Sequence, residues 1–449
     1  MMISGTLKKL PIFPHIRRFV VAYSGGLDSH VLLNSISGCK EMGDIEIVAI
    51  HVNHGLSDHA DTWSEHCATQ CKKLGIAYVG VTVDATPDAG ESPEAAAREV
   101  RYSAFEDVIN EGDCLLTAHH QDDQAETLLI QLLRGAGPRG LAAMPVFSDF
   151  GKGWHARPLL AVARIELETY AKENNLSWVD DESNFDTGYD RNFLRHEILP
   201  LLKERFPAVS ATLSRSSSLC SEAALILTDS ARNDYQSMLV GSNTFSANAL
   251  FDLGEIRARN VLHQWFRDNE YPTPTAAQMQ RIWEDVVCTS DGSCPLVTWS
   301  EIEVRRYRDV IYVSTALKPH DAKQVLQWDM DEPLDITGLG QLSCLSHRAN
   351  DNTKLLSEKR LAGKMIEMRF RQGGEEIKPI GRNGHHSLKK LFQEQGITPW
   401  ERDRLPLLFV EDDLIAVADL WIADSYKANT GELGYEINWS PSGNFGALS

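Results

Sequence analysis

No stretch of this 449-residue sequence approaches the roughly 20 consecutive apolar residues that a membrane-spanning helix needs. Residues 1–13 also lack the apolar core of a secretory signal. Cysteine is scarce, with eight in the chain and no CxxC pair, which excludes a disulfide framework and a zinc ribbon. We therefore expect a cytoplasmic protein with no membrane partner.

Positive charge is in deficit, because the formal net charge is −19. Such a balance argues against non-specific nucleic-acid binding, whose affinity comes mostly from neutralising phosphates. The deficit is uneven, since residues 361–410 hold nine Lys or Arg against six Asp or Glu. An RNA partner that binds this region therefore stays open.

The first 200 residues alternate short apolar runs with segments of helical period. RRFVVAYS, IEIVAIHVNH, AYVGVTVDA and CLLTAHH are rich in Val, Ile and Leu and predict buried strands. ESPEAAAREVRYSAFEDVI between two of them predicts a helix. Repeated strand, helix and strand predict an α/β domain whose parallel sheet is covered by helices on both faces.

The later sequence predicts further domains. We expect residues 1–212 to form the α/β domain, 213–315 a small helical and mixed middle domain, and 362–440 a compact α+β C-terminal domain. Residues 316–361 gather turn residues and Asp with weak periodicity, so they are expected as a connector or as part of the middle domain.

A glycine-rich segment follows the first predicted strand directly. Adjacent glycines let the backbone approach a ligand, and the next helix start directs its N–H groups at an anion, so phosphate is the expected ligand. The segment is neither GxxxxGK[ST] nor GxGxxG, and a plain strand-to-helix turn capped by serine is the alternative. Its residues are Ser24, Gly25, Gly26, Leu27, Asp28 and Ser29.

This SGGLDS segment resembles the phosphate loop of the PP-loop ATP pyrophosphatases, an adenine nucleotide alpha-hydrolase-like, Rossmann-like fold. The resemblance implies that ATP is bound at residues 24–29 and cleaved to AMP and pyrophosphate, with Mg²⁺ bridging the phosphates. It also implies that Asp28 is a magnesium or phosphate-ordering carboxylate and that the serines contact phosphate oxygens.

A second polar cluster, His119-His120-Gln121-Asp122-Asp123, ends the strand CLLTA and opens a predicted helix. Carboxylates there face the crevice in which open α/β sheets bind ligands. Asp122 is a candidate Mg²⁺ ligand, Asp123 a candidate to bind and deprotonate an ammonium, and His119 a candidate to relay a proton or contact an adenylate. His119 and Asp123 are the preferred pair. Asp122 and Glu126 could instead be surface charges that complement the helix dipole.

Further blocks resemble the tRNA(Ile)-lysidine synthetase family in order along the chain, among them HVNHGL, EAAAREVRY, ARPLL, DESNFDTGYDRNFLRHEILP and the last predicted domain. The resemblance implies that the wobble cytidine of the CAU-anticodon tRNA(Ile) is adenylated and that free L-lysine displaces AMP. The product, lysidine, changes the codon read from AUG to AUA and the amino acid from methionine to isoleucine.

The same resemblance implies that Arg191 steadies the phosphate during transfer; a surface salt bridge with Asp190 or Asp186 is the alternative. Arg98 and Arg101 could contact phosphate or RNA. Near the C-terminus the implied RNA contacts are Gly373, Gly374, Lys389, Lys390, Arg402 and Arg404, whose basic members could equally form a solvated face. Core packing is expected for the aromatic residues among them, Phe370, Phe392 and Trp400.

Two other functions remain open from the sequence. A 2-thiolation enzyme would attack the same carbonyl with sulfur, although such enzymes commonly carry CxxC pairs. A non-catalytic ATP- or RNA-binding module would not need the acid–base residues of the second cluster. A homodimer is open as well.

Overall fold

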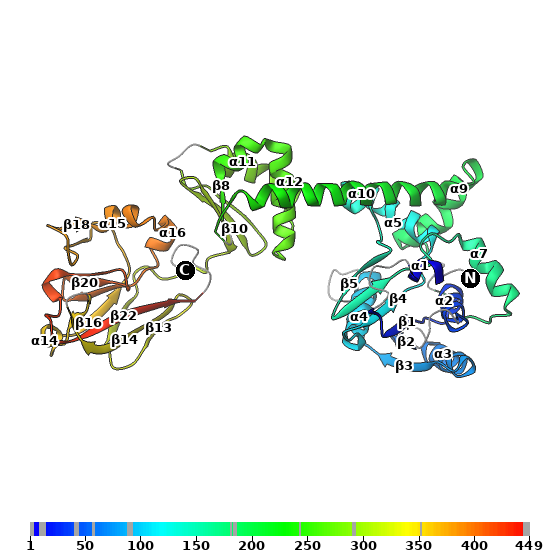
Figure 1. The fold of residues 1–449 in the computed structure, drawn as a ribbon, viewed down its shortest axis with the longest axis horizontal. Coiled ribbons are helices and arrows are strands. Elements are labelled where there is room, and N and C mark those ends of the chain that lie inside the picture. The colour runs from blue at the N-terminus through cyan, green and yellow to red at the C-terminus, as the bar shows by residue number, and fades with distance from the viewer. Residues whose placement is uncertain are drawn as a thin grey trace. The chain divides into compact units, whose positions relative to one another are not determined.

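The computed structural model describes residues 4–8, 15–39, 45–55, 59–87, 93–179, 182, 186–241, 244–289, 293–350 and 353–442. The chain divides into two compact units, Met1–Leu227 and Thr228–Ser449 (Figure 1). None of the helices in these ranges is long and apolar enough to cross a lipid bilayer.

The first unit is built on a six-stranded sheet in the order β3-β2-β1-β4-β6-β5. Neighbouring strands are parallel except for the antiparallel edge pair β5–β6. The central β4 is buried at every residue, as expected for a strand covered on both faces. The strands are β1 (Arg18–Ala22), β2 (Glu46–Asn53), β3 (Ala77–Thr82), β4 (Asp113–Leu116), β5 (Phe147–Phe150) and β6 (Gly153–Ala156).

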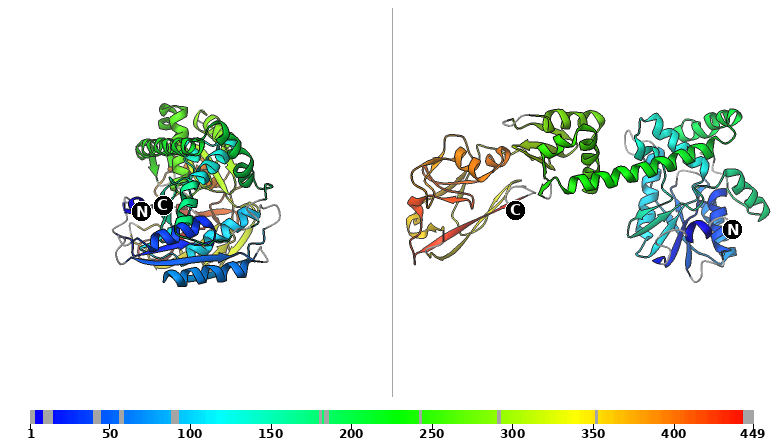
Figure 2. Two further views of the ribbon diagram at one scale, coloured as in Figure 1. Left: turned by 90° about the vertical axis from the view of Figure 1, so that its right-hand side faces the viewer. Right: turned by 45° about the horizontal axis from the view of Figure 1, so that its top comes forward.

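Helices cover both faces of this sheet, which confirms the predicted α/β class (Figure 2). One core joins Phe19 and Val21 of β1 to α2, α3 and α7, and the other joins Val20 to Phe105 of α4. The alternation of neighbouring β1 residues between the two cores follows from the two-residue period of a strand. The helices are α1 (Ser4–Lys8), α2 (Leu27–Ser37), α3 (Ala60–Leu74), α4 (Pro93–Val108), α5 (Gln121–Leu133), α6 (Pro138–Leu141) and α7 (Arg164–Glu173).

A run of helices closes the first unit. α8 (Asp190–Phe193), the π-helical turn η4 (Leu194–Ile198) and α9 (Leu199–Arg205) follow one another, and α8 and η4 contact α5. The long α10 (Val209–Gln236) begins in the first unit and ends in the second. The arginines of α8 and η4 are thereby brought to the start of α5.

The second unit begins with a five-stranded sheet in the order β7-β8-β11-β10-β9. Its core gathers Phe245, Trp265 and Phe266, which are almost fully buried and meet edge to face. The elements are β7 (Leu239–Gly241), β8 (Thr244–Ser246), α11 (Ala247–Leu253), α12 (Glu255–Asp268), α13 (Ala276–Arg281), the π-helical η5 (Ile282–Val287), β9 (Leu296–Trp299), β10 (Ile302–Tyr307) and β11 (Val310–Thr315).

The remaining strands of the second unit form a five-stranded sheet, β12-β16-β19-β20-β21, a four-stranded sheet, β13-β14-β22-β15, and the short pair β17–β18. The elements are β12 (Val325–Trp328), β13 (Leu334–Ile336), β14 (Gly340–Arg348), β15 (Leu356–Ser357), α14 (Glu358–Leu361), β16 (Ile366–Arg369), β17 (Glu376–Ile377), β18 (His386–Ser387), α15 (Leu388–Gln395), α16 (Pro399–Arg402), β19 (Leu407–Val410), β20 (Asp413–Val417), β21 (Trp421–Ile422), η6 (Asp424–Tyr426) and β22 (Leu433–Pro441).

This pairing corrects the expectation for residues 316–361. β12 pairs with β16, and β14 pairs along its whole length with β22. The segment is therefore neither a connector nor a part of the middle domain, because its strands complete the C-terminal sheets. Weak local periodicity hid strands whose partners lie far away in the sequence.

Candidate active site

The carboxyl ends of β1, β4 and β6 lie side by side, because these strands are parallel neighbours. The glycine-rich loop follows β1, the His-Asp cluster follows β4, and Arg157 follows β6. The topology thus assembles both predicted clusters at one edge of the sheet, where open α/β sheets bind ligands.

The loop after β1 is shaped for close approach. Gly25 has a φ of +85°, and a Cβ there would lie 2.9 Å from Cys67 Sγ, so a side chain is excluded by conformation and by space. The hydroxyls of Ser24 and Ser29 lie 3.1 Å apart at the start of α2. Amide groups and hydroxyls at a helix start suit a phosphate group.

Asp28, in the first turn of α2, already has a cationic partner. Arg164 Nη1 lies 2.7 and 2.6 Å from its two carboxylate oxygens, and His120 Nε2 lies 3.7 Å from Oδ2. Burial raises the pKa of Asp28, and His120 and Arg164 oppose that shift. Arg164 stands 136 positions from Asp28, and nothing local in the sequence indicates that the two side chains meet.

His120, and not His119, lies among the carboxylates. Its Nδ1 accepts a hydrogen bond from the backbone N–H of Asp122 at 3.2 Å, which places the ring proton on Nε2. Nε2 lies 3.4 Å from Asp123 Oδ2 as well as near Asp28. His120 therefore connects the two predicted clusters. Only the structure identifies it as the N-cap of α5, because histidine is not one of the residue types preferred at that position.

Two arginines from α8 and η4 converge on two acidic residues of α5. Arg191 donates from Nε to Glu126 (2.8 Å) and from Nη2 to Asp123 (3.2 Å). Arg195 donates from Nε to Glu126 (2.7 Å) and from Nη2 to Asp123 (2.9 Å). Glu126 is fully buried, so it is not a surface charge, and Arg191 does not form the surface salt bridge considered as its alternative.

These contacts change the chemistry open to Asp123. Burial alone would raise its pKa, but His120 and Arg191 together lower the pKa far below its ordinary value. A carboxylate so strongly stabilised is a weak base. The geometry therefore favours Asp123 as an anchor for the arginines and the N-terminal amide of α5 over Asp123 as the acceptor of a proton.

His119 does not pair directly with Asp123. Its Nδ1 lies 2.8 Å from the hydroxyl of Thr117, which lies 2.8 Å from His155 Nε2 of β6 as well, and the ring is half-buried. Burial lowers the pKa of His119 to about 3, so the ring is neutral at physiological pH. The preferred pair of the sequence analysis is thus replaced by His120 with Asp123.

Asp122 does not join Asp28 in a metal site. Lys203 Nζ lies 2.7 Å from its carboxylate, and although burial opposes the shift, this hydrogen bond lowers the pKa of Asp122. Within the described ranges no three His, Cys, Asp or Glu side chains are grouped to hold a metal ion. Proteins usually hold Mg²⁺ with one or two carboxylates completed by substrate phosphates, and of Asp28 and Asp122 it is Asp28 that lies in the glycine-rich loop.

The predicted RNA-binding residues divide into two sets. Arg98, Arg101, Lys389 and Lys390 are exposed, and the guanidinium of Arg98 lies over the Tyr102 ring at 4.7 Å. Arg402 is buried, with 7% exposed, and donates to Ile397 O (2.8 Å) and Tyr307 Oη (2.7 Å). Its prediction as an RNA contact is wrong, because hydrogen bonds inside the second unit use its guanidinium.

The other predicted residues near the C-terminus also divide into buried and exposed positions. Phe370 and Phe392 are core residues, as expected, and Trp400 packs edge to face on Tyr312. Arg404 is half-buried and donates to Lys318 O at 2.7 Å. Gly373 and Gly374 have φ of +101° and +92° with open space around them, which suits a turn at the surface.

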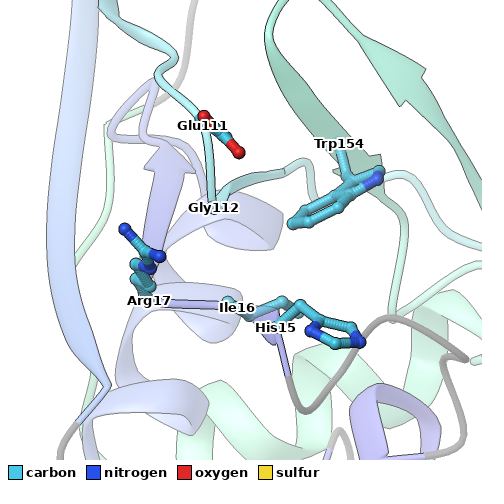
Figure 3. A pocket seen from close by; sticks show the side chains of 6 residues that line it. All are labelled: His15, Ile16, Arg17, Glu111, Gly112 and Trp154. Carbon is cyan, nitrogen blue, oxygen red and sulfur yellow. The ribbon is translucent and has the colours of Figure 1, made fainter.

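A cavity of about 480 Å³ lies at the opposite, amino edge of the sheet (Figure 3). It is lined by His15, Ile16, Arg17, Glu111, Gly112 and Trp154, which precede or begin β1, β4 and β6. Because parallel strands bind ligands at their carboxyl ends, this cavity is separate from the candidate active site.

Comparison with known proteins agrees with this arrangement. The family described as "PP-loop domain" matches residues 4–202, "TilS substrate binding domain" matches 245–312, and "TilS substrate C-terminal domain" matches 366–439. The chain is 40% identical over 424 residues to a tRNA(Ile)-lysidine synthase of Coxiella burnetii, covering 94% of this chain and 93% of the relative.

Two further relatives carry the same name. The protein of Methylococcus capsulatus is 40% identical over 425 residues, covering 94% of this chain and 96% of the relative. That of Vibrio cholerae is 36% identical over 428 residues, covering 95% and 96%. The similarity therefore extends over nearly the whole of both chains.

Proposed function

The chain belongs to the tRNA(Ile)-lysidine synthase family, and from this premise we propose that it uses ATP to join free L-lysine to the wobble cytidine of the CAU-anticodon tRNA(Ile). In the first step the 2-carbonyl oxygen of the cytidine attacks the α-phosphorus of ATP, and pyrophosphate leaves. In the second step the lysine ε-amine forms a bond to C2 of the cytidine ring. The bond from C2 to the adenylated oxygen breaks, so that AMP leaves, and the amine loses a proton.

The observation that carries the proposal is the assembly of the phosphate loop with the arginine–carboxylate network at one sheet edge. His120 Nε2 lies 3.7 Å from Asp28 of the loop and 3.4 Å from Asp123 of the network. A phosphate site next to fixed guanidinium groups suits adenylyl transfer, because negative charge builds up on phosphate oxygens. Arg191 and Arg195 supply positive charge at a fixed position to stabilise it.

We assign the Mg²⁺ that accompanies ATP to Asp28, together with phosphate oxygens of the nucleotide. A bound divalent ion would neutralise the charge of the leaving pyrophosphate. Arg164 Nη1 contacts both carboxylate oxygens of Asp28. Binding of Mg²⁺ by Asp28 would replace this cationic partner with another and would leave Arg164 available to a phosphate.

The exposed basic residues complete the proposal for the tRNA. Lys389 and Lys390 begin α15, and Arg98 and Arg101 lie on α4 beside the catalytic edge. Exposed cations neutralise phosphates and release counterions on binding RNA. These four residues are proposed as tRNA contacts, with half-buried Arg404 as a fifth.

The rival thiolation reaction is less well supported by the cysteines of the site. Cys67, which packs beneath Gly25, is fully buried, and burial raises the pKa of its thiol to about 12. Burial likewise raises the pKa of Cys71 to about 11. Thiols that stay protonated and covered are poor carriers of sulfur.

The proposal is tested with the full chain, ATP, Mg²⁺, radiolabelled lysine and tRNA(Ile) with the CAU anticodon. We expect label in the RNA and one AMP per lysine joined. Without lysine, ATP labelled at the α-phosphate should leave an adenylated tRNA. The methionine elongator tRNA, which shares the anticodon, is the control and should stay unlabelled. Release of pyrophosphate without lysine in the RNA, together with formation of 2-thiocytidine when a sulfide donor is added, would assign the rival reaction.

A further inference from the structure

Three polar side chains stand in a row behind His119 at the ends of β4 and β6. Arg157 Nη2 lies 3.2 Å from His155 Nδ1, His155 Nε2 lies 2.8 Å from Thr117 Oγ1, and the same Oγ1 lies 2.8 Å from His119 Nδ1. Thr117, His155 and Arg157 are all buried. Their order therefore comes from the packing of two neighbouring strands.

The direction of this chain of hydrogen bonds follows from its first member. A guanidinium can only donate, so His155 Nδ1 must accept and His155 carries its proton on Nε2. Nε2 then donates to Thr117 Oγ1. The hydroxyl can accept two hydrogen bonds but has only one proton to donate, and among the described residues His119 Nδ1 is the acceptor that lies against it, so the proton is donated there. His119 consequently carries its own proton on Nε2, the ring nitrogen that does not contact Thr117 and that ends this series of hydrogen bonds.

The electrostatics agree with this assignment. Burial, aided by Arg157, lowers the pKa of His155 to about 2, which keeps its ring neutral. Burial also lowers the pKa of His119, and the nearby guanidinium groups of Arg157 and Arg191 lower it further, although Asp123 opposes them. Neither ring gains a second proton near neutral pH.

A neutral imidazole that presents an N–H to the site is a hydrogen-bond donor there. It cannot act as a base at that nitrogen, because the lone pair is absent. The structure gives Nε2 of His119 no hydrogen-bond partner within the described part of the chain. The guanidinium groups near the ring favour an anionic ligand. Of the anions that the reaction brings, the lysine carboxylate and the phosphates of ATP, the adenylyl phosphate is the one on which negative charge builds up during transfer.

We propose that His119 donates its Nε2–H to an oxygen of the adenylyl phosphate, and that Thr117, backed by His155 and Arg157, is the positioning residue that fixes this tautomer. The inference rests on the proposed function and specifies the role of one residue in it. It replaces the proton relay expected from the sequence with a hydrogen bond from His119 to phosphate. The direction of that hydrogen bond is set by Arg157 and His155 through Thr117.

Two substitutions of His119 distinguish its role as a hydrogen-bond donor from a role as a base. His119→Gln keeps an N–H donor near the position of Nε2 but has no basic nitrogen, whereas His119→Ala has neither. We expect His119→Gln to stay within about 10-fold of wild type and His119→Ala to lose about 100-fold or more in kcat, the range of one oxyanion donor. Equal losses in the two variants would contradict the role of His119 as a hydrogen-bond donor and would favour its role as a base.

Substitution of Thr117 tests the positioning role. Thr117→Val keeps the shape and removes the hydroxyl, whereas Thr117→Ser keeps the hydroxyl. We expect Thr117→Val to lower kcat about 10- to 100-fold with little change in KM, as outer hydrogen-bond partners commonly do, and Thr117→Ser to restore activity. Thr169→Val, which removes an exposed hydroxyl bonded to Ile165 O on α7, is the matched control and should be unchanged.

The tautomer itself is read from nitrogen chemical shifts in protein labelled with ¹⁵N-histidine, with His119→Gln to assign the signal. We expect a single Nε2–H tautomer in wild type and a mixture in Thr117→Val. Adding Mg²⁺ and a non-hydrolysable ATP analogue should shift the Nε2 signal. A proton on Nδ1, or a signal that the analogue does not move, would overturn the inference.

This spectroscopic test needs no turnover. If wild type joins no lysine to tRNA but the analogue still moves the His119 signal, the proposed function fails and the phosphate contact stands. If lysine is joined and the signal does not move, the function stands and the phosphate contact fails.

Discussion

Basic residues in the two units of the chain are held in opposite ways. Arg191 and Arg195 of the first unit each bind two carboxylates, one of them fully buried. Lys389 and Lys390 of the second unit lie exposed on α15. On the proposed function, burial and pairing, more than residue type, would decide whether a cation orders a reacting phosphate or attracts a distant one.

The largest expected effect comes from breaking the buried network. Glu126→Gln leaves Arg191 and Arg195 without the carboxylate that receives both of their Nε–H groups. Removing one partner of a buried pair costs about 3–5 kcal/mol of unfolding free energy. Urea unfolding of the full chain measures this loss. Glu394→Gln, which breaks the exposed pair with Arg382, is the matched control and should leave the midpoint unchanged.

The next effect is on the reaction rate. Arg191→Lys keeps a positive charge but loses the planar fork that reaches Glu126 and Asp123 together. We expect kcat for lysidine formation to fall about 100-fold, the scale of one lost transition-state donor. Arg281→Lys, in an exposed pair with Asp285, controls for the substitution itself. A normal rate in Arg191→Lys would remove Arg191 from the catalytic set.

A smaller effect distinguishes Arg402 from the exposed lysines of α15. Arg402→Met keeps the apolar stem but loses the hydrogen bonds to Ile397 O and Tyr307 Oη. We expect a loss of about 1–3 kcal/mol in unfolding free energy, since buried acceptors are left unpaired. The salt dependence of tRNA binding should not change. A reduced salt dependence with full stability would reverse our correction and make Arg402 an RNA contact.

The smallest effect on the fold is expected at α15. Lys389→Ala and Lys390→Ala should leave the unfolding midpoint in place, because both side chains are exposed. Each should weaken tRNA binding and reduce the slope of log affinity against log salt by about 1. Filter binding at several salt concentrations measures both the affinity for tRNA and this slope. Unchanged slopes would show that these lysines form only a solvated face.

Local signals in the sequence predicted much of the catalytic unit. The apolar runs gave four of its six strands, and SGGLDS gave the phosphate loop, because a tight turn between a buried strand and a helix needs glycine at fixed places. They also brought Asp28 and Asp123 into one site, since parallel strands end at a common edge. These conclusions need only neighbours in sequence and one rule of topology.

The residues that complete the site were harder to find. Arg191 and Arg195 are four apart, and Asp123 and Glu126 are three apart, so each pair shares one helix face. That spacing was visible in the sequence, but nothing local says that the two faces meet. Arg164 and His155 reach the site only through the order of the strands and helices.

The sequence by itself determined the α/β class, the phosphate loop and, through resemblance, the family of this protein. Only the tertiary structure decided that His120 connects the two clusters, that Asp123 is too strongly stabilised to be a good base, and that residues 316–361 belong to the C-terminal sheets. The reason is physical. Backbone conformation follows from nearby residues, whereas protonation and pairing depend on burial and on partners far away in the chain.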